Sequence, residues 1–246
     1  MKFDSRYIYI ILAIIVFASI MSGSFSLLAV LFSVPGVLLA ITFHEYAHAL
    51  VAYKLGDDTP KVQGRLSLNP FTHLDPVAVV LLMFTHIGWG KPVEINPNNF
   101  NKKISAKTGE AIVAAAGPVM NFLLAIVLTI ITCALDLFAT NFVSFSKIGL
   151  IIYIILKYAI IVNIGLGVFN LIPLPPLDGS KVLMAFLPYN AKRWFEDHEK
   201  IFYIVFLIIW ITPIAGEIVS PIINAIDTGI TNMIYGLFSI FMWKGK

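Results

Sequence analysis

The stretch His44-Glu45-Tyr46-Ala47-His48 lies inside one long apolar run, from about Leu27 to Tyr53. Residues four apart on an α-helix differ by roughly 40° in direction and 6 Å in height. The two imidazoles therefore project from one face and can bind one metal ion, and Glu45 lies where it can take a proton from metal-bound water. Ionisable side chains in a membrane-type segment are costly and mark functional sites. The stretch predicts a zinc centre within a membrane helix.

The composition predicts an all-α polytopic membrane protein. Of the 246 residues, 59% are hydrophobic and 13% are charged, whereas soluble domains carry about 25% charged residues. Membrane lipid is therefore expected to surround the chain. The formal charge of +3 is small and spread over loops, which argues against a nucleic-acid partner. No polar stretch is long enough for a soluble module, so residues 1–246 are expected to form a single membrane domain.

The apolar segments predict about five to six transmembrane helices. The expected segments are Tyr7 to Met21, Leu27 to Tyr53, Ala111 to Leu137, Ile148 to Leu171, Ile201 to Ile226 with breaks at Pro213 and Pro221, and Ile230 to Trp243, which lies on the membrane or returns through it. Residues 74–88 are short for a membrane span, and segments of this length are more often re-entrant or interfacial; the re-entrant alternative is favoured over a full crossing, which would split the basic loops across the membrane. Residues 59–68 alternate weakly, which predicts a short strand whose edge an extended substrate would join. Residues 179–200 form a polar, mostly helical connection.

The distribution of basic residues predicts the topology. If residues 74–88 are re-entrant, all the basic loops share one side, with the N-terminal Lys2 and Arg6, in the segments 54–65, 91–107 and 181–200. The positive-inside rule makes that side cytoplasmic. His44 precedes Tyr53 by nine residues, so the metal would lie roughly 14 Å deep, in a site that opens toward the cytoplasm.

The pentapeptide supplies two ligands, whereas catalytic zinc usually takes three protein ligands and a water. Asp178 is the best third candidate, because it follows a proline-rich, non-helical stretch, and irregular backbone at membrane depth lines cavities. The alternative is that Asp178 caps the next helix. Asp136 lies toward the opposite end of its span. The remaining candidates lie in or beside loops or on a solvated face: Asp57, Asp58, His73, Asp75, His86 and His198.

Four further motifs carry a family resemblance. They are GRLSLNPFTHLDP (64–76), GWGKPVEINPNNF (88–100), AAAGPVMN (114–121) and FNLIPLPPLDGSKVL (169–183). Together with His44 to His48, they resemble the site-2 protease family of intramembrane zinc metalloproteases, in its compact prokaryotic subgroup. The resemblance covers about Thr42 to Leu187, so residues 42–187 are expected to form the motif-bearing catalytic core, and residues 188–246 the C-terminal membrane helices.

The resemblance implies that His44, His48 and Asp178 bind one Zn2+ per chain and that Glu45 is the catalytic base. Asn121 and Asn170 occupy polar positions that are typical of the family near the site; the alternative is hydrogen bonding between helices. The implied activity is hydrolysis of a peptide bond within or near a transmembrane segment of a membrane-anchored protein, as in regulated intramembrane proteolysis, after an upstream protease has trimmed the same substrate. The implied location is a prokaryotic cell membrane.

Two other classes of protein place His, Glu and Asp in a membrane. A metal transporter is expected to show inverted repeats or similar broken helices in both halves, and the sequence has no internal repeat. A non-catalytic metal-binding scaffold needs no general base and usually closes its zinc with four ligands. Glu45 therefore argues against a scaffold.

Overall fold

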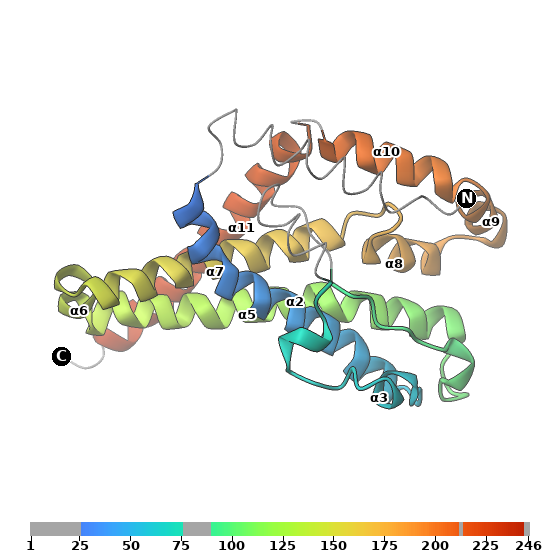
Figure 1. Ribbon diagram of the computed structural model, residues 1–246, viewed down its shortest axis with the longest axis horizontal. Helices are drawn as coiled ribbons and strands as arrows, with labels where there is room; N and C mark the ends of the chain where they lie inside the picture. Colours follow the sequence, from blue (N-terminus) through green and yellow to red (C-terminus); the bar gives the residue numbers. More distant parts are fainter. Residues whose placement is uncertain (1–25, 76–89, 212–213, 244–246) are drawn as a thin grey trace.

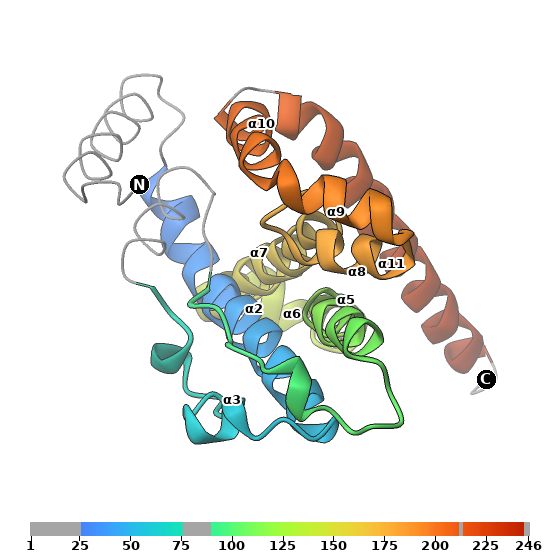
Figure 2. The same cartoon turned by 90° about the vertical axis from the view of Figure 1, so that its right-hand side faces the viewer.

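The computed structural model describes residues 26–75, 90–211 and 214–243, and every regular element in these ranges is helical (Figure 1, Figure 2). Three long helices, α2 (Leu27–Lys54), α5 (Ala106–Phe138) and α7 (Lys147–Asn170), pack against one another, and α11 (Ile214–Trp243) runs along α7 and α5. The shorter helices are α3 (Thr59–Val62), η1 (Pro70–Thr72), η2 (Pro97–Asn99), α6 (Thr140–Phe145), α8 (Asp178–Phe186), α9 (Tyr189–Asp197) and α10 (Glu199–Ile211).

Each of the three long helices begins after a serine. The hydroxyls of Ser26, Ser105 and Ser146 each accept a hydrogen bond from the backbone N–H three residues further along, which satisfies one N–H group that a helix start leaves unpaired. These helices have mean hydropathies of 2.1, 2.3 and 2.2 in their most apolar windows, and all three are long and apolar enough to cross a membrane. The predicted spans at 27–53, 111–137 and 148–171 are confirmed as helices of this kind.

Small residues let the long helices approach closely. A Cβ atom added at Gly36 would lie 2.6 Å from the Cα of Ala159, so α2 and α7 nearly touch at this level. Ala125 and Ile160 are buried between α5 and α7, and isoleucines of α11 pack against them. The middle of α2 is therefore held in a tight bundle, just before the two histidines.

The predicted strand at 59–68 is wrong. Thr59–Val62 forms the short helix α3, with Pro60 in its first turn, and Gly64 follows with φ of +70°. A proline at the start of a helix has a suitable φ, and a positive φ at glycine ends the turn. Within the described residues, the β-pairing is limited to an isolated antiparallel bridge between Leu74 and Gly90.

The predicted break at Pro221 is also wrong, and so is the separate segment 230–243. Pro221 lies inside the continuous helix α11. A proline removes one backbone hydrogen bond, but packing compensates, because Ile223, Ile226 and Ile230 all contact the core between α5 and α7. The polar connection at 179–200 is helical as predicted, in α8 and α9.

Three predictions fall wholly or largely outside the described residues. They are the first span at 7–21, most of the re-entrant segment at 74–88, and the break at Pro213.

Candidate metal centre

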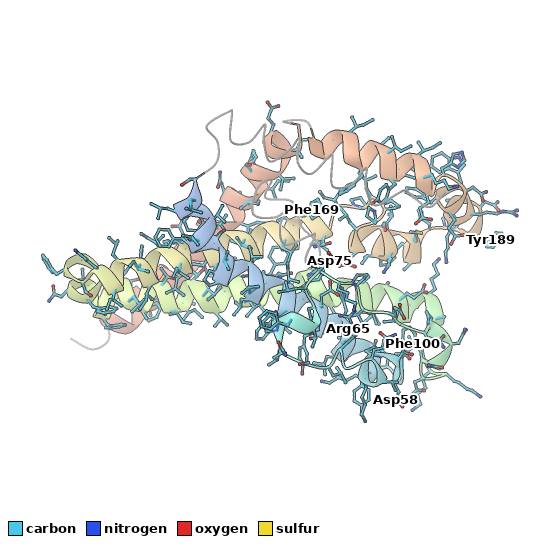
Figure 3. All side chains as sticks on the ribbon, in the orientation of Figure 1. Asp58, Arg65, Asp75, Phe100, Phe169 and Tyr189 are labelled. Carbon is cyan, nitrogen blue, oxygen red and sulfur yellow. The ribbon has the colours of Figure 1, made fainter. Side chains whose placement is uncertain are left out.

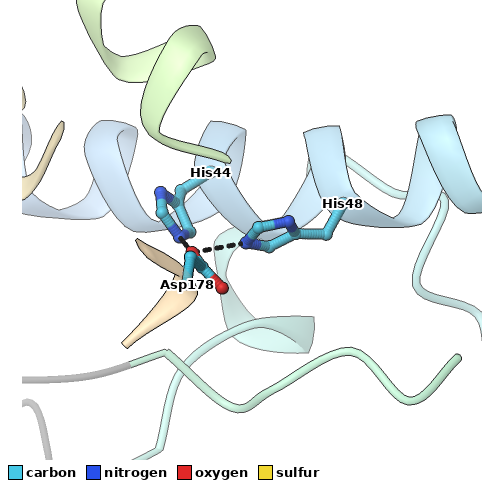
Figure 4. A group of neighbouring side chains, drawn as sticks. All are labelled: His44, His48 and Asp178. Carbon is cyan, nitrogen blue, oxygen red and sulfur yellow. Dashed lines mark hydrogen bonds and ion pairs between the residues drawn. The ribbon is translucent and has the colours of Figure 1, made fainter. Parts of the chain in front are cut away.

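His44 and His48 lie one turn apart on α2 and project toward the same side (Figure 4). Their ring centroids are 4.6 Å apart and their planes are nearly perpendicular, at 87°. Both residues are buried, with 5% and 8% of their surface exposed. The spacing that the sequence predicts to align two imidazoles does align them.

Asp178 reaches the same point from a distant part of the chain. Its Oδ2 lies 3.1 Å from Nε2 of His44 and 3.1 Å from Nε2 of His48 (Figure 4). Asp178 is the first residue of α8, and Leu177 holds the capping position, so the alternative of a capping aspartate is wrong. The next residue must be small, because a Cβ atom at Gly179 would overlap the carbonyl of Leu171.

The outer nitrogen of each histidine is held by α5. His48 Nδ1 lies 2.7 Å from the backbone carbonyl of Val113, which only accepts hydrogen bonds, so Nδ1 is the donor. His44 Nδ1 lies 2.6 Å from Oδ1 of Asn121. The amide of Asn121 is oriented by the Ala40 carbonyl, to which its Nδ2 donates at 3.1 Å. His44 Nδ1 therefore donates too, and in both neutral rings the lone pair is on Nε2.

This donor set fits zinc. Two Nε2 lone pairs and a carboxylate oxygen converge within 4.8 Å of one another, and none of the three atoms carries a proton when the rings are neutral. Three acceptors repel one another at this distance unless a cation lies among them. Two histidines and one carboxylate are a ligand set that catalytic zinc takes, and a hydrogen bond on the far ring nitrogen is the usual support for such histidines.

Three positions four residues apart on α5 face the histidine pair. Val113 and Asn121 hold the rings, and between them a Cβ atom at Gly117 would lie 2.5 Å from His48 Nε2 and 2.7 Å from His44 Nε2. The resemblance that the AAAGPVMN motif carries names Asn121 as a position near the site. The motif also contains Gly117, but the sequence does not single it out as a site residue. Val113 contributes its backbone carbonyl, and an amino-acid sequence holds no signal for such a contact.

A cavity of about 400 Å³ opens beside the centre. Its lining includes His44, Glu45, His48 and Asp178. Glu45 is 8% exposed, and the backbone of Gly90 lies against its side chain, because a Cβ atom there would be 2.5 Å from Oε1. The carboxylate thus faces a partly enclosed space next to the candidate metal ligands.

The other candidates lie elsewhere. Asn170 lines the cavity, but its amide donates to the Leu166 carbonyl of its own helix at 3.0 Å. Asp136 accepts hydrogen bonds from the hydroxyls of Tyr153 at 3.2 Å and Tyr235 at 2.5 Å, which tie α5 to α7 and α11. The other described candidates also lie outside the cluster: Asp57, Asp58, His73, Asp75 and His198. His86 is not among the described residues.

Comparison with known proteins identifies the family of this chain. The family model of peptidase family M50 matches residues 32–212, and the chain belongs to this family. The predicted membership of the site-2 proteases, and with it the prediction of a peptidase, is confirmed.

Three relatives illustrate the similarity. "Putative zinc metalloprotease YwhC" of Bacillus subtilis is 34% identical over 202 residues, which cover 82% of this chain and 90% of that protein. "Putative zinc metalloprotease Rip2" of Mycolicibacterium smegmatis is 26% identical over 187 residues, which cover 73% and 66%. "Zinc metalloprotease MJ0392" of Methanocaldococcus jannaschii is 30% identical over 176 residues, which cover 72% and 39%. No solved structure matches the chain.

Proposed function

We propose that this protein is a zinc-dependent intramembrane endopeptidase that cuts membrane-anchored proteins within or near a transmembrane segment. The observation that carries the proposal is the convergence of His44 Nε2, His48 Nε2 and the Asp178 carboxylate beside a cavity that Glu45 also lines. One Zn2+ per chain would be held by these three residues. The zinc metalloprotease names of the relatives support the same activity.

Each polar residue of the centre has a distinct role in the proposed reaction. When bound, zinc supplies a Lewis acid that activates water and polarises the scissile carbonyl. Glu45 takes the proton of the attacking water and passes it to the leaving amine. Asn121 and the Val113 carbonyl keep the imidazoles in the tautomer that leaves Nε2 free to bind metal.

The cavity suits an unwound, apolar stretch of substrate. Its walls include Ile41, Val93, Leu166 and Phe169 alongside the polar centre, a mixture that is typical of ligand sites. A transmembrane helix hides each carbonyl in a backbone hydrogen bond, so the substrate must unwind before it can be cut. A single-span protein trimmed by an upstream protease, as in regulated intramembrane proteolysis, is the substrate class that we propose.

The membrane topology is part of the proposal. Within the described residues, α2, α5 and α7 are long and apolar enough to span a membrane, and we propose that α10 and α11 also lie in the membrane. Both histidines lie in the half of α2 that ends at Lys54. With the basic loops on the cytoplasmic side of a prokaryotic cell membrane, the centre opens toward the cytoplasm.

Cleavage of single-span reporter proteins in proteoliposomes tests the proposal. We expect the wild-type protein to hold equimolar zinc and to cut within the reporter span, and Glu45→Gln to keep its zinc and lose cleavage by several orders of magnitude. Equal cutting by both proteins would refute the role of Glu45. A wild-type protein without zinc would refute the metal centre, and zinc-dependent uptake without cleavage would favour a transporter.

A further inference from the structure

One wall of the cavity is a non-helical segment, residues 90–96, which we call the wall segment. Gly90, Pro92, Val93 and Ile95 line the cavity from this segment. At its first residue the backbone lies against Glu45. The position of the wall segment therefore sets the space in which a peptide can lie beside the proposed base.

Two polar side chains from the loop after α2 hold the wall segment. The Asp57 Oδ2 accepts a hydrogen bond from the backbone N–H of Asn96 at 2.6 Å. The guanidinium of Arg65 donates to the carbonyl of Pro92 at 3.4 Å and, through its other terminal nitrogen, to the carbonyl of Thr72. One anchor is thus at the end of the segment, and the other is near its start.

Asp57 is fully buried and satisfied by donors from two segments. Its Oδ1 accepts from the Thr59 hydroxyl at 2.5 Å and from the Asn99 amide at 2.9 Å. A buried carboxylate is tolerated only when its oxygens are hydrogen-bonded. Because these donors come from the turn at α3 and from η2, the carboxylate joins the start of the loop to the far end of the wall segment.

Arg65 is buried without a carboxylate partner among the residues that the structure describes. It is 7% exposed, and its two hydrogen bonds go to backbone carbonyls of segments 20 residues apart, at Thr72 and Pro92. Burying a cation carries a desolvation cost, and here the hydrogen bonds to two backbone carbonyls offset it and join the two segments. Figure 3 shows Arg65 on the side of the bundle that also carries Asp58 and Phe100.

We propose that Asp57 and Arg65 are positioning residues for peptide hydrolysis: they fix the wall segment and thereby the register in which a substrate lies against Glu45. Neither residue touches the candidate metal ligands. The inference rests on the proposed function, because it assigns a task in the same cavity. If Asp57 and Arg65 hold the wall segment, their replacement should also loosen the backbone of this segment, whether or not a substrate is cut.

The test compares Asp57→Ala, Arg65→Met and Arg65→Lys with the wild type, using the full chain and a single-span reporter. Lys102→Met is the matched control, because Lys102 is an exposed cation in the same region. We expect equimolar zinc in all five proteins. For Asp57→Ala and Arg65→Met, we expect the KM for the reporter to rise about tenfold, and the cuts to spread onto neighbouring peptide bonds. Arg65→Lys should lie between Arg65→Met and the wild type, both in the KM and in the distribution of cuts.

Site distribution separates positioning from folding, because a partly unfolded sample loses active enzyme without moving the bond that is cut. A single, unchanged cut with wild-type KM in both variants would overturn the proposal, and so would loss of zinc in step with activity. If the wild type holds zinc and cuts no reporter, the proposed function fails instead. In that case hydrogen exchange still tests whether the two residues anchor the wall segment. In Asp57→Ala and Arg65→Met, the backbone amides of Asn96 and Lys91 should lose protection, while the amides of α2 remain protected. Unchanged protection of Asn96 and Lys91 would overturn the anchoring.

Discussion

Replacing Gly117 by alanine should disable the metal centre while leaving α5 intact. A Cβ atom at this position would lie 2.5 Å from His48 Nε2, whereas ordinary van der Waals contact begins at 3.4 Å, so about 0.9 Å of overlap must be relieved. The rings cannot simply retreat, because Asn121 and the Val113 carbonyl hold them from the same face of α5. The methyl group therefore displaces the two nitrogens that the metal needs.

The size of the effect follows from this displacement. A misplacement of about 1 Å in a catalytic constellation costs on the order of 100-fold in rate, and disturbed support of a ligand costs about 10–100-fold in metal affinity. We expect Gly117→Ala to bind zinc at least about 100-fold more weakly, which corresponds to about 2.7 kcal/mol. The helix itself should gain stability, because alanine is favoured over glycine in helices by about 1 kcal/mol.

Titration of zinc against a competing chelator measures the zinc affinity, and cleavage of the reporter at saturating zinc measures the effect on the rate. Gly229→Ala is the matched control: Gly229 also lies in a helix, α11, and a Cβ atom there meets nothing within 4 Å. The control should keep wild-type affinity and activity. Gly117→Ala with wild-type zinc affinity and cleavage would show that Nε2 of the two histidines does not bind the metal.

Two further predictions concern the support of the centre and of the wall segment. Asn121→Leu should weaken zinc binding about 10–100-fold, because His44 loses the acceptor for its Nδ1. Asn170→Leu should leave the zinc affinity unchanged, since the Asn170 amide donates to a carbonyl of its own helix. Equal zinc affinities of the two variants in the chelator titration would contradict this. Burial raises the pKa of Asp57, but hydrogen bonds from Thr59, Asn96 and Asn99 outweigh burial and hold the pKa below its ordinary value. The stabilisation is then fully present above the unfolded pKa of about 3.9 and is lost as the pH falls through the folded value. Protection of the 90–96 amides, corrected for intrinsic exchange, should fall in acid in the wild type, and Asp57→Asn should lack this pH dependence.

Some elements were predictable because their signals are local. The run of apolar residues around His44 and His48 predicts both the helix and the shared face, because the 3.6-residue period alone places them together. The spans at 111–137 and 148–171 follow from hydropathy in the same way. Local signals also mislead at two places. Weak alternation at 59–68 predicts a strand, but Asp57 accepts a hydrogen bond from Thr59 and the segment 59–62 is helical. Pro221 predicts a break, but packing against α7 keeps α11 continuous through the proline.

Local patterns in the sequence are enough to predict helices apolar enough to cross a membrane, a pair of histidines on one helix face with an adjacent glutamate, and the resemblance to a peptidase family. The folded chain is needed to show that Asp178, 134 residues from His44, meets both imidazoles. It is also needed to show that Val113, Gly117 and Asn121 shape their surroundings, and that Asp57 and Arg65 hold the wall of the cavity. The physical reason is that helical period and hydropathy are properties of neighbouring residues, whereas ligand convergence, close packing and buried hydrogen bonds depend on segments that meet only when the chain is folded.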